Sequence, residues 1–81
     1  MWYVYALKSL KDNCLYIGIS ENPEERLKQH NAGMTKSTKP RRPFKTIHKE
    51  CCGDRLAARK REKYLKSGVG REFLKQFIGP S

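Results

Sequence analysis

Two short alternating segments near the start of this chain, joined by a turn, limit the folds that it can adopt. Residues 2–8 and 14–20 each place apolar side chains alternately on two faces, as β-strands do. The segment 10–13 (LKDN) between them is typical of a turn, so we expect an antiparallel hairpin. Because parallel strands need a long crossover, a hairpin here excludes a doubly wound parallel sheet.

Two tyrosines, Tyr5 and Tyr16, are expected together on one face of this hairpin. If Tyr5 lies opposite Tyr16, the residues of the other face pair across the strands and form the core: Trp2 with Ile19, Val4 with Ile17 and Ala6 with Leu15. The sequence permits this register without requiring it.

A helix is expected directly after the hairpin. Asn22 suits the N-cap, Pro23 suits the first helical position, and Glu25 completes a capping box. The helix should run to about Ala32 and end at Gly33.

The rest of the chain completes one small domain over residues 1–81. We expect, in chain order, a loop at 34–43, a third strand at 44–49 whose buried face is undecided, a helix at 55–67 ended by Gly68, a short helix after Gly70 that runs to about Ile78, and a tail at 79–81. The order β-β-α-β-α-α predicts an α/β fold of the α+β type, with a three-stranded, mainly antiparallel sheet and flanking helices.

Charge indicates the class of partner. The chain has 18 Lys plus Arg against 8 Asp plus Glu, a formal net charge of +10, which favours a polyanion such as DNA. A basic surface kept for solubility and an anionic membrane surface are the alternatives, although no apolar run reaches the roughly 20 residues of a spanning helix. We find no signal-peptide pattern and expect a cytoplasmic protein with no membrane partner. Three cysteines without paired spacing argue against disulfides.

Arg26 and His30 are candidate functional residues on the first helix. They are four residues apart and therefore lie on one face. Lys28 and Gln29 are also polar, so a solvated face is the alternative reading. A helix that leans over the hairpin would point Arg26 and His30 at the tyrosines.

Glu62 is the one carboxylate between Arg55 and Lys66, at the margin of an apolar face that contains Leu65. It could simply pair with basic neighbours, at about 0.2–0.5 kcal/mol for each ion pair. It could instead bind one Mg²⁺ or Mn²⁺, with water and substrate phosphate completing the coordination. A single acid fits a one-metal site better than a two-metal site.

A basic loop is the third candidate. The chain has no acidic residue between Arg26 and Lys49. A flexible solvated loop is one interpretation, and phosphate contact with little sequence preference is the one that we favour. The predicted nucleic-acid-binding residues are Lys36, Ser37, Thr38, Lys39, Arg41 and Arg42.

Together these residues carry a family likeness. Residues 2–77 resemble the GIY-YIG nuclease superfamily, most of all its small stand-alone bacterial members: segment 3–5 (YVY) corresponds to the first motif and segment 16–18 (YIG) to the second. Arg26 falls at the family's catalytic arginine, His30 at a histidine of many members, and Glu62 at the metal-binding glutamate. The chain departs from the family in having Tyr3 for glycine and Val4 for isoleucine, in having Ile19 where some excision-repair members have lysine, and in lacking an asparagine beyond Glu62.

The resemblance implies an endonuclease that hydrolyses DNA phosphodiester bonds with one divalent metal, Mg²⁺ or Mn²⁺, in DNA repair or recombination. Tyr5 or Tyr16 is the expected general base, Arg26 and the metal stabilise charge, and His30 relays a proton or binds phosphate. Branched, damaged or nonspecific DNA is the expected substrate. The alternatives are a non-catalytic basic nucleic-acid-binding module on the same fold, and a domain that needs a larger protein partner for targeting.

Overall fold

The structure, a computed structural model, describes residues 1–78, and the predicted tail at 79–81 lies outside the described residues. Its elements follow the predicted order β-β-α-β-α-α. They are β1 (Trp2–Ser9), β2 (Leu15–Ser20), α1 (Pro23–Asn31), a short 3₁₀ turn (Lys39–Arg41), β3 (Phe44–Gly53), α2 (Arg55–Lys66) and α3 (Gly68–Lys75). None of the helices in residues 1–78 is both long and apolar enough to cross a membrane.

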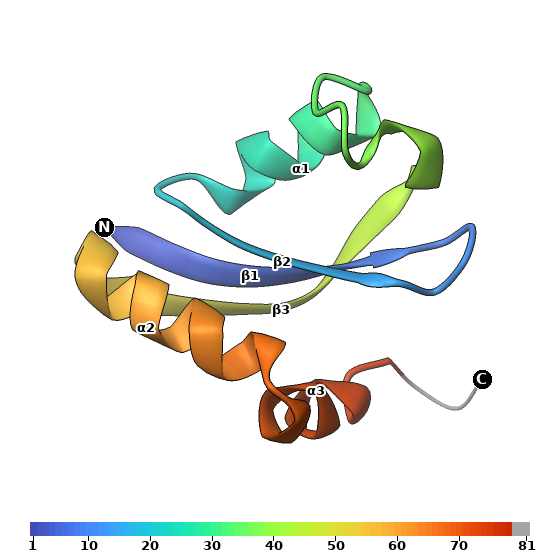
Figure 1. The fold of residues 1–81 in the computed structure, drawn as a ribbon. Helices are drawn as coiled ribbons and strands as arrows, with labels where there is room; N and C mark the ends of the chain where they lie inside the picture. The colour runs from blue at the N-terminus through green and yellow to red at the C-terminus, as the bar shows by residue number, and fades with distance from the viewer. Residues whose placement is uncertain (79–81) are drawn as a thin grey trace.

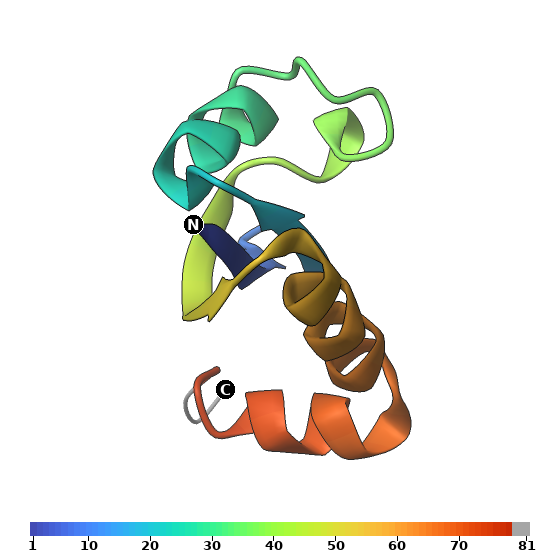
Figure 2. The same ribbon diagram turned by 90° about the vertical axis from the view of Figure 1, so that its left-hand side faces the viewer.

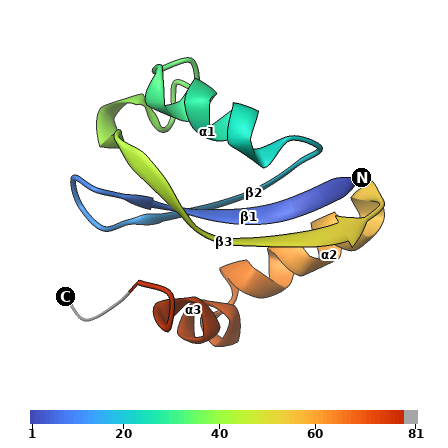
Figure 3. The same ribbon diagram turned by 180° about the vertical axis from the view of Figure 1, so that it is seen from behind.

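The three strands form one antiparallel sheet in the order β2-β1-β3, which confirms the predicted fold class. Helix α1 covers one face, and α2 and α3 cover the other (Figure 1). Both β2 and β3 are edge strands, and the first half of β3 bends towards α1 (Figure 3). A shift in the β1–β3 register at Ala6/Leu7 accompanies this bend, as expected for a bulge.

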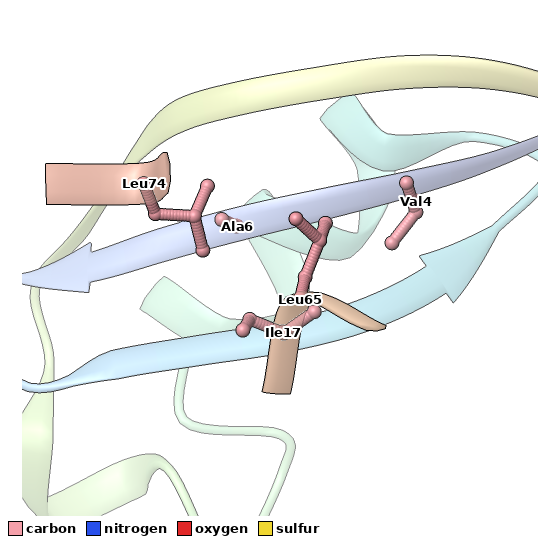
Figure 4. Close-up of a cluster of buried hydrophobic side chains, with 5 residues drawn as sticks. All are labelled: Val4, Ala6, Ile17, Leu65 and Leu74. Atoms are coloured by element: carbon pink, nitrogen blue, oxygen red, sulfur yellow. The ribbon is translucent and has the colours of Figure 1, made fainter. Parts of the chain in front are cut away.

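Strand β1 separates two apolar clusters because its side chains alternate between the two faces of the sheet. The cluster under α2 and α3 consists of Val4, Ala6, Ile17, Leu65 and Leu74 (Figure 4). Leu15 and Ile19 pack against it, so the predicted core face of the hairpin is confirmed. The cluster on the α1 side consists of Tyr5, Leu7 and Phe44, with Tyr16 and Leu27 packed against it.

The hairpin register differs from the one considered in the sequence analysis by two residues. Tyr5 lies opposite Gly18, and Tyr16 lies opposite Leu7. The turn sets this pairing, because the Ser9 amide donates to the Cys14 carbonyl at 2.8 Å and leaves the predicted four residues in the loop. A two-residue shift keeps every side chain on its face, so the two tyrosines still share the α1 side.

The predicted bounds of two elements were wrong. Strand β3 continues to Gly53, beyond the predicted end at Lys49, because Cys51 and Gly53 pair with the first residues of β1. Helix α3 starts at Gly68 and ends at Lys75, where we expected a start after Gly70 and an end near Ile78. Its start is fixed by Ser67, whose hydroxyl accepts from the Gly70 amide at 3.3 Å.

The loop between α1 and β3 is fixed to the rest of the fold near both ends. The side chain of Asn31 accepts from the Phe44 amide at 2.6 Å and donates to the Phe44 carbonyl at 3.1 Å. The buried hydroxyl of Ser9, in the hairpin, donates to the Arg41 carbonyl at 2.6 Å. These bonds hold the basic loop beside β2.

Candidate active site

An open cleft lies along the free edge of β2. Its volume is about 520 Å³, and its lining residues come from the hairpin, the basic loop, α2 and α3: Cys14, Leu15, Tyr16, Ile17, Arg41, Glu62, Lys66 and Arg71. The end view shows why these elements can meet, since α1 and the loop lie on one side of the sheet and α2 with α3 on the other (Figure 2). Only an edge strand gives side chains from both layers access to one cleft.

Tyr5 reaches towards this edge by crossing the neighbouring strand at Gly18. A Cβ atom on Gly18 would lie 2.7 Å from the Tyr5 hydroxyl oxygen and 2.9 Å from Cζ. Gly18 is therefore the residue that lets the ring lie flat against β2. Tyr5 is 1% exposed, and burial raises its pKa, while the hydrogen bond and positive charge of Arg26 lower it.

Tyr16 occupies a more open position than Tyr5. It is half-buried, it lines the β2-edge cleft, and it also lines a smaller cleft beneath the loop beside Ser37 and Arg41. Its ring makes an edge contact with His30, with 4.8 Å between the centroids. Of the two tyrosines, Tyr16 is the one whose surroundings admit a substrate.

His30 lies beneath the loop with no exposed surface. Its Nδ1 atom is 2.8 Å from the Thr38 hydroxyl, and its Nε2 atom is buried without a hydrogen-bond partner among residues 1–78. Burial lowers the pKa of His30, and the nearby charge of Arg26 lowers it further. The imidazole is therefore neutral at pH 7 and has one nitrogen able to accept a proton.

Arg26 sits one turn before His30 on α1, as predicted. Its guanidinium Nη1 donates to Gln29 at 2.7 Å, and its side chain borders a shallow groove with Ile19 and Asn22 near the end of β2. The guanidinium thus lies near the Tyr5 hydroxyl and along the same edge as the cleft.

Glu62 points into the cleft from the opposite side of the sheet. The residue is 7% exposed, and its two oxygens pair with Arg59 and Lys66, each at 3.3 Å. The ion pairs that the sequence allowed are thus present. Both cations are about half exposed, so each pair stabilises the fold by no more than about 1 kcal/mol.

The donor set fits a metal that is shared with substrate. Within residues 1–78 there is no group of three His, Cys, Asp or Glu side chains that could hold an ion. Among the residues that line this cleft, Glu62 is the one carboxylate, and Mg²⁺ commonly binds through one carboxylate with water and phosphate oxygens.

Most of the basic loop is exposed. Five of its six predicted DNA-binding side chains lie at the surface: Lys36, Ser37, Lys39, Arg41 and Arg42. Thr38 is 3% exposed and bonds to His30, so its hydroxyl does not lie at the surface with the other five. The hydroxyl of Thr38 is instead the hydrogen-bond partner of the buried His30 imidazole.

Sequence reasoning missed two cations of the cleft, Lys66 and Arg71. Arg71 makes no ion pair within residues 1–78, and α3 carries it to the cleft. The placement depends on Gly70, where a Cβ atom would overlap the Tyr64 carbonyl and the Leu65 backbone. The position of Arg71 depends on how tightly α3 packs on α2, and no charge pattern in the sequence indicates that packing.

Known proteins match this chain along most of its length. Residues 1–75 match the model of the GIY-YIG family, described as the GIY-YIG catalytic domain. A UPF0213 protein of Staphylococcus haemolyticus is 40% identical over 74 residues, which cover 90% of this chain and 89% of that protein. A UPF0213 protein of Desulfotalea psychrophila is 37% identical over 67 residues, covering 80% and 60%. One from Clostridium perfringens is 43% identical over 67 residues, covering 82% and 71%. These names state no activity, and no solved structure matches the chain significantly.

Gly18→Ala should destabilise the protein because the new methyl group collides with Tyr5. We expect a loss of about 1–3 kcal/mol in the free energy of unfolding, although Gly→Ala within a strand is otherwise favourable by about 0.5–1 kcal/mol. A double-mutant cycle with Tyr5→Leu, measured by urea unfolding, isolates the collision. The loss should largely disappear in the Tyr5→Leu background. Additive effects of the two substitutions would show that the Tyr5 ring does not restrict the size of the side chain at residue 18.

Stability should fall with acidification below the ordinary histidine pKa of about 6.5. The pKa of His30 is lowered in the folded state. Between the folded and the unfolded pKa of His30, the unfolded chain binds a proton that the folded chain does not. The stability present above about pH 6.5 is therefore lost as the pH falls to the folded pKa. Urea unfolding at pH 7.5 and 5.5, compared between wild type and His30→Gln, measures this loss. Equal losses in the two proteins would contradict a buried neutral His30.

Proposed function

Because the chain belongs to the GIY-YIG catalytic-domain family, which is a nuclease family, we propose that it is an endonuclease that hydrolyses DNA phosphodiester bonds. In this proposal residues 1–81 act as one domain that requires one Mg²⁺ or Mn²⁺. The protein acts in the cytoplasm, in DNA repair or recombination. The observation that carries it is the meeting of Tyr16, Glu62 and three basic residues, Arg41, Lys66 and Arg71, at one open cleft.

The basic residues around the cleft supply the binding of DNA. Arg41 comes from the loop above the β2 edge, and Lys66 and Arg71 come from the helices below it. A sugar–phosphate backbone that crosses the β2 edge would meet cations on both sides. The exposed loop side chains extend this surface, and none of them is held in a geometry that reads bases, so binding should be sensitive to salt and tolerant of sequence.

Tyr16 is the proposed general base for the attacking water. Tyr5 is closed to solvent and burial raises its pKa, whereas Tyr16 lines the cleft. Tyr5 instead orients Arg26, whose guanidinium stabilises the charge that develops on the phosphate. The difference in burial supports Tyr16 over Tyr5 as the general base, a choice that the sequence left open.

Glu62 is the proposed metal ligand. A bound divalent ion would add positive charge beside the phosphate and the leaving oxygen. Arg59 and Lys66 are each about half exposed, so both cations can turn away from Glu62. Lys66 would then be free to contact phosphate, because it already lines the cleft.

The second candidate is a non-catalytic DNA-binding module on the same fold. The paired state of Glu62 favours it, since a carboxylate neutralised by Arg59 and Lys66 already has a structural role. A larger protein partner that targets the domain to its substrate is compatible with either candidate.

Supercoiled plasmid incubated with the protein and Mg²⁺ or Mn²⁺ tests the proposal. We expect nicking that EDTA abolishes, and a rate that falls by about a hundredfold or more in Tyr16→Phe and in Glu62→Gln. Glu72→Gln is the matched control, because Glu72 is an exposed carboxylate on α3 that pairs with Lys75 at 2.8 Å. It should nick at the wild-type rate.

The same assay separates the two candidates. DNA binding that weakens steeply with salt, without any metal-dependent nicking, would support the module and overturn the nuclease. Nicking that survives unchanged in Glu62→Gln would overturn the metal site.

A further inference from the structure

A buried polar chain lies between the basic loop and the tyrosines. His30 is 0% exposed and Thr38 is 3% exposed. The Thr38 hydroxyl oxygen is 2.8 Å from His30 Nδ1 and 3.3 Å from the Thr35 carbonyl oxygen. Aromatic rings surround the imidazole, with Tyr16 at 4.8 Å and Phe44 at 6.0 Å between centroids. Because a neutral imidazole carries one proton, the contact with Thr38 decides which nitrogen holds it.

Counting donors and acceptors favours one tautomer. If the Thr38 hydroxyl donates to the Thr35 carbonyl, its oxygen accepts from a protonated Nδ1, and both hydrogen bonds form. If the hydroxyl donates to Nδ1 instead, the bond to Thr35 is lost, and Nε2–H becomes a buried donor that no atom of residues 1–78 accepts. The Thr35 carbonyl also accepts from two backbone amides, at 3.0 and 3.2 Å, so the bond from Thr38 is the longest of the three. The first arrangement still keeps one more bond than the second.

We propose that Thr38 is a positioning residue that holds His30 with its proton on Nδ1 and keeps Nε2 as a bare proton acceptor beside Tyr16. The consequence for catalysis rests on the proposed nuclease function, whereas the tautomer itself does not. Thr38 acts through His30 and touches neither DNA nor the reacting atoms in this proposal.

The burial of Nε2 specifies the route of the proton. Solvent cannot reach Nε2, so a proton must arrive from a neighbouring side chain. The hydroxyl of Tyr5 lies over Gly18 beside Arg26, which leaves Tyr16, whose ring is also the nearer one. In the free protein no bond joins Tyr16 to Nε2 among the described residues, so the pair must close when DNA enters the cleft.

The step balances as two coupled proton transfers. As water oxygen bonds to phosphorus, the water proton passes to the Tyr16 oxygen and the Tyr16 proton passes to Nε2. The bond from phosphorus to the leaving oxygen breaks, and that oxygen takes a proton from solvent. His30 becomes an imidazolium whose Nδ1–H still donates to Thr38, and it returns its proton to solvent through Tyr16 after product release.

The position of Thr38 also links substrate binding to this acceptor. Its chain neighbours Ser37 and Lys39 are exposed and belong to the surface proposed to hold phosphate. A loop displaced from its site would lose the Thr38–His30 contact. The loop that binds the DNA backbone therefore also holds the histidine in its active form.

Nitrogen-15 NMR of the imidazole rings tests the tautomer, and plasmid nicking with Mn²⁺ tests its consequence. Wild type and Thr38→Ser should both show His30 with a protonated Nδ1 and an unprotonated Nε2. Thr38→Val has the same shape but no hydroxyl, so Nδ1 should lose its preference for the proton. Its nicking rate should fall by about tenfold or more, while DNA affinity stays within about twofold. Thr46→Val, at an exposed position of β3, is the matched control.

Several outcomes would overturn the proposal. A wild-type His30 protonated on Nε2 would refute the tautomer directly. A Thr38→Val protein that keeps the wild-type tautomer would refute the role of the hydroxyl, and one that changes tautomer but nicks normally would refute the proton route. A thermal melt confirms that each variant is folded. Absence of nicking in wild type would count against the nuclease function alone, since the NMR measurement decides the tautomer without it.

Discussion

The candidate site forms at the free edge of β2. A sheet separates the residues above it from those below it, and here the tyrosines and His30 lie on the α1 side while Glu62 belongs to α2 on the other. Side chains from the two layers can act on one substrate only where the sheet ends. The strand order β2-β1-β3 leaves β2 unpaired on its outer side, and the cleft forms there.

Strand β1 joins the stability of the fold to the geometry of the site. Its residues Val4 and Ala6 build the core under α2 and α3, while the intervening Tyr5 crosses β2 at Gly18. A slip of one residue would move Tyr5 to the α2 side of the sheet and Val4 and Ala6 to the α1 side, so core packing fixes the tyrosine on its face. The basic loop is held by hydrogen bonds instead, because those of Ser9 and Asn31 place Thr38 over His30.

Local patterns predicted the elements and the faces, but not the distances between them. The N-caps Asn22 and Asp54 and the alternation of the hairpin were readable because each depends on a few neighbouring residues. The register considered from the sequence, with Tyr5 opposite Tyr16, is two residues away from the observed one. Both registers place every side chain on the same face, so only the turn distinguishes them. Thr38 and Arg71 were beyond reach, since the role of Thr38 depends on a buried imidazole eight residues away and that of Arg71 on how closely α3 packs on α2.

We propose that Glu62 and Tyr16 face one metal and one DNA strand across the β2 edge. Paramagnetic broadening of backbone NMR signals by Mn²⁺, in the presence of a short DNA duplex, measures how close the metal lies to each residue. We expect the signals of Tyr16 and Ile17 to broaden, those of Cys51 on the opposite edge strand to persist, and Glu62→Gln to abolish the effect. Broadening that is centred away from β2, or that survives in Glu62→Gln, would contradict it.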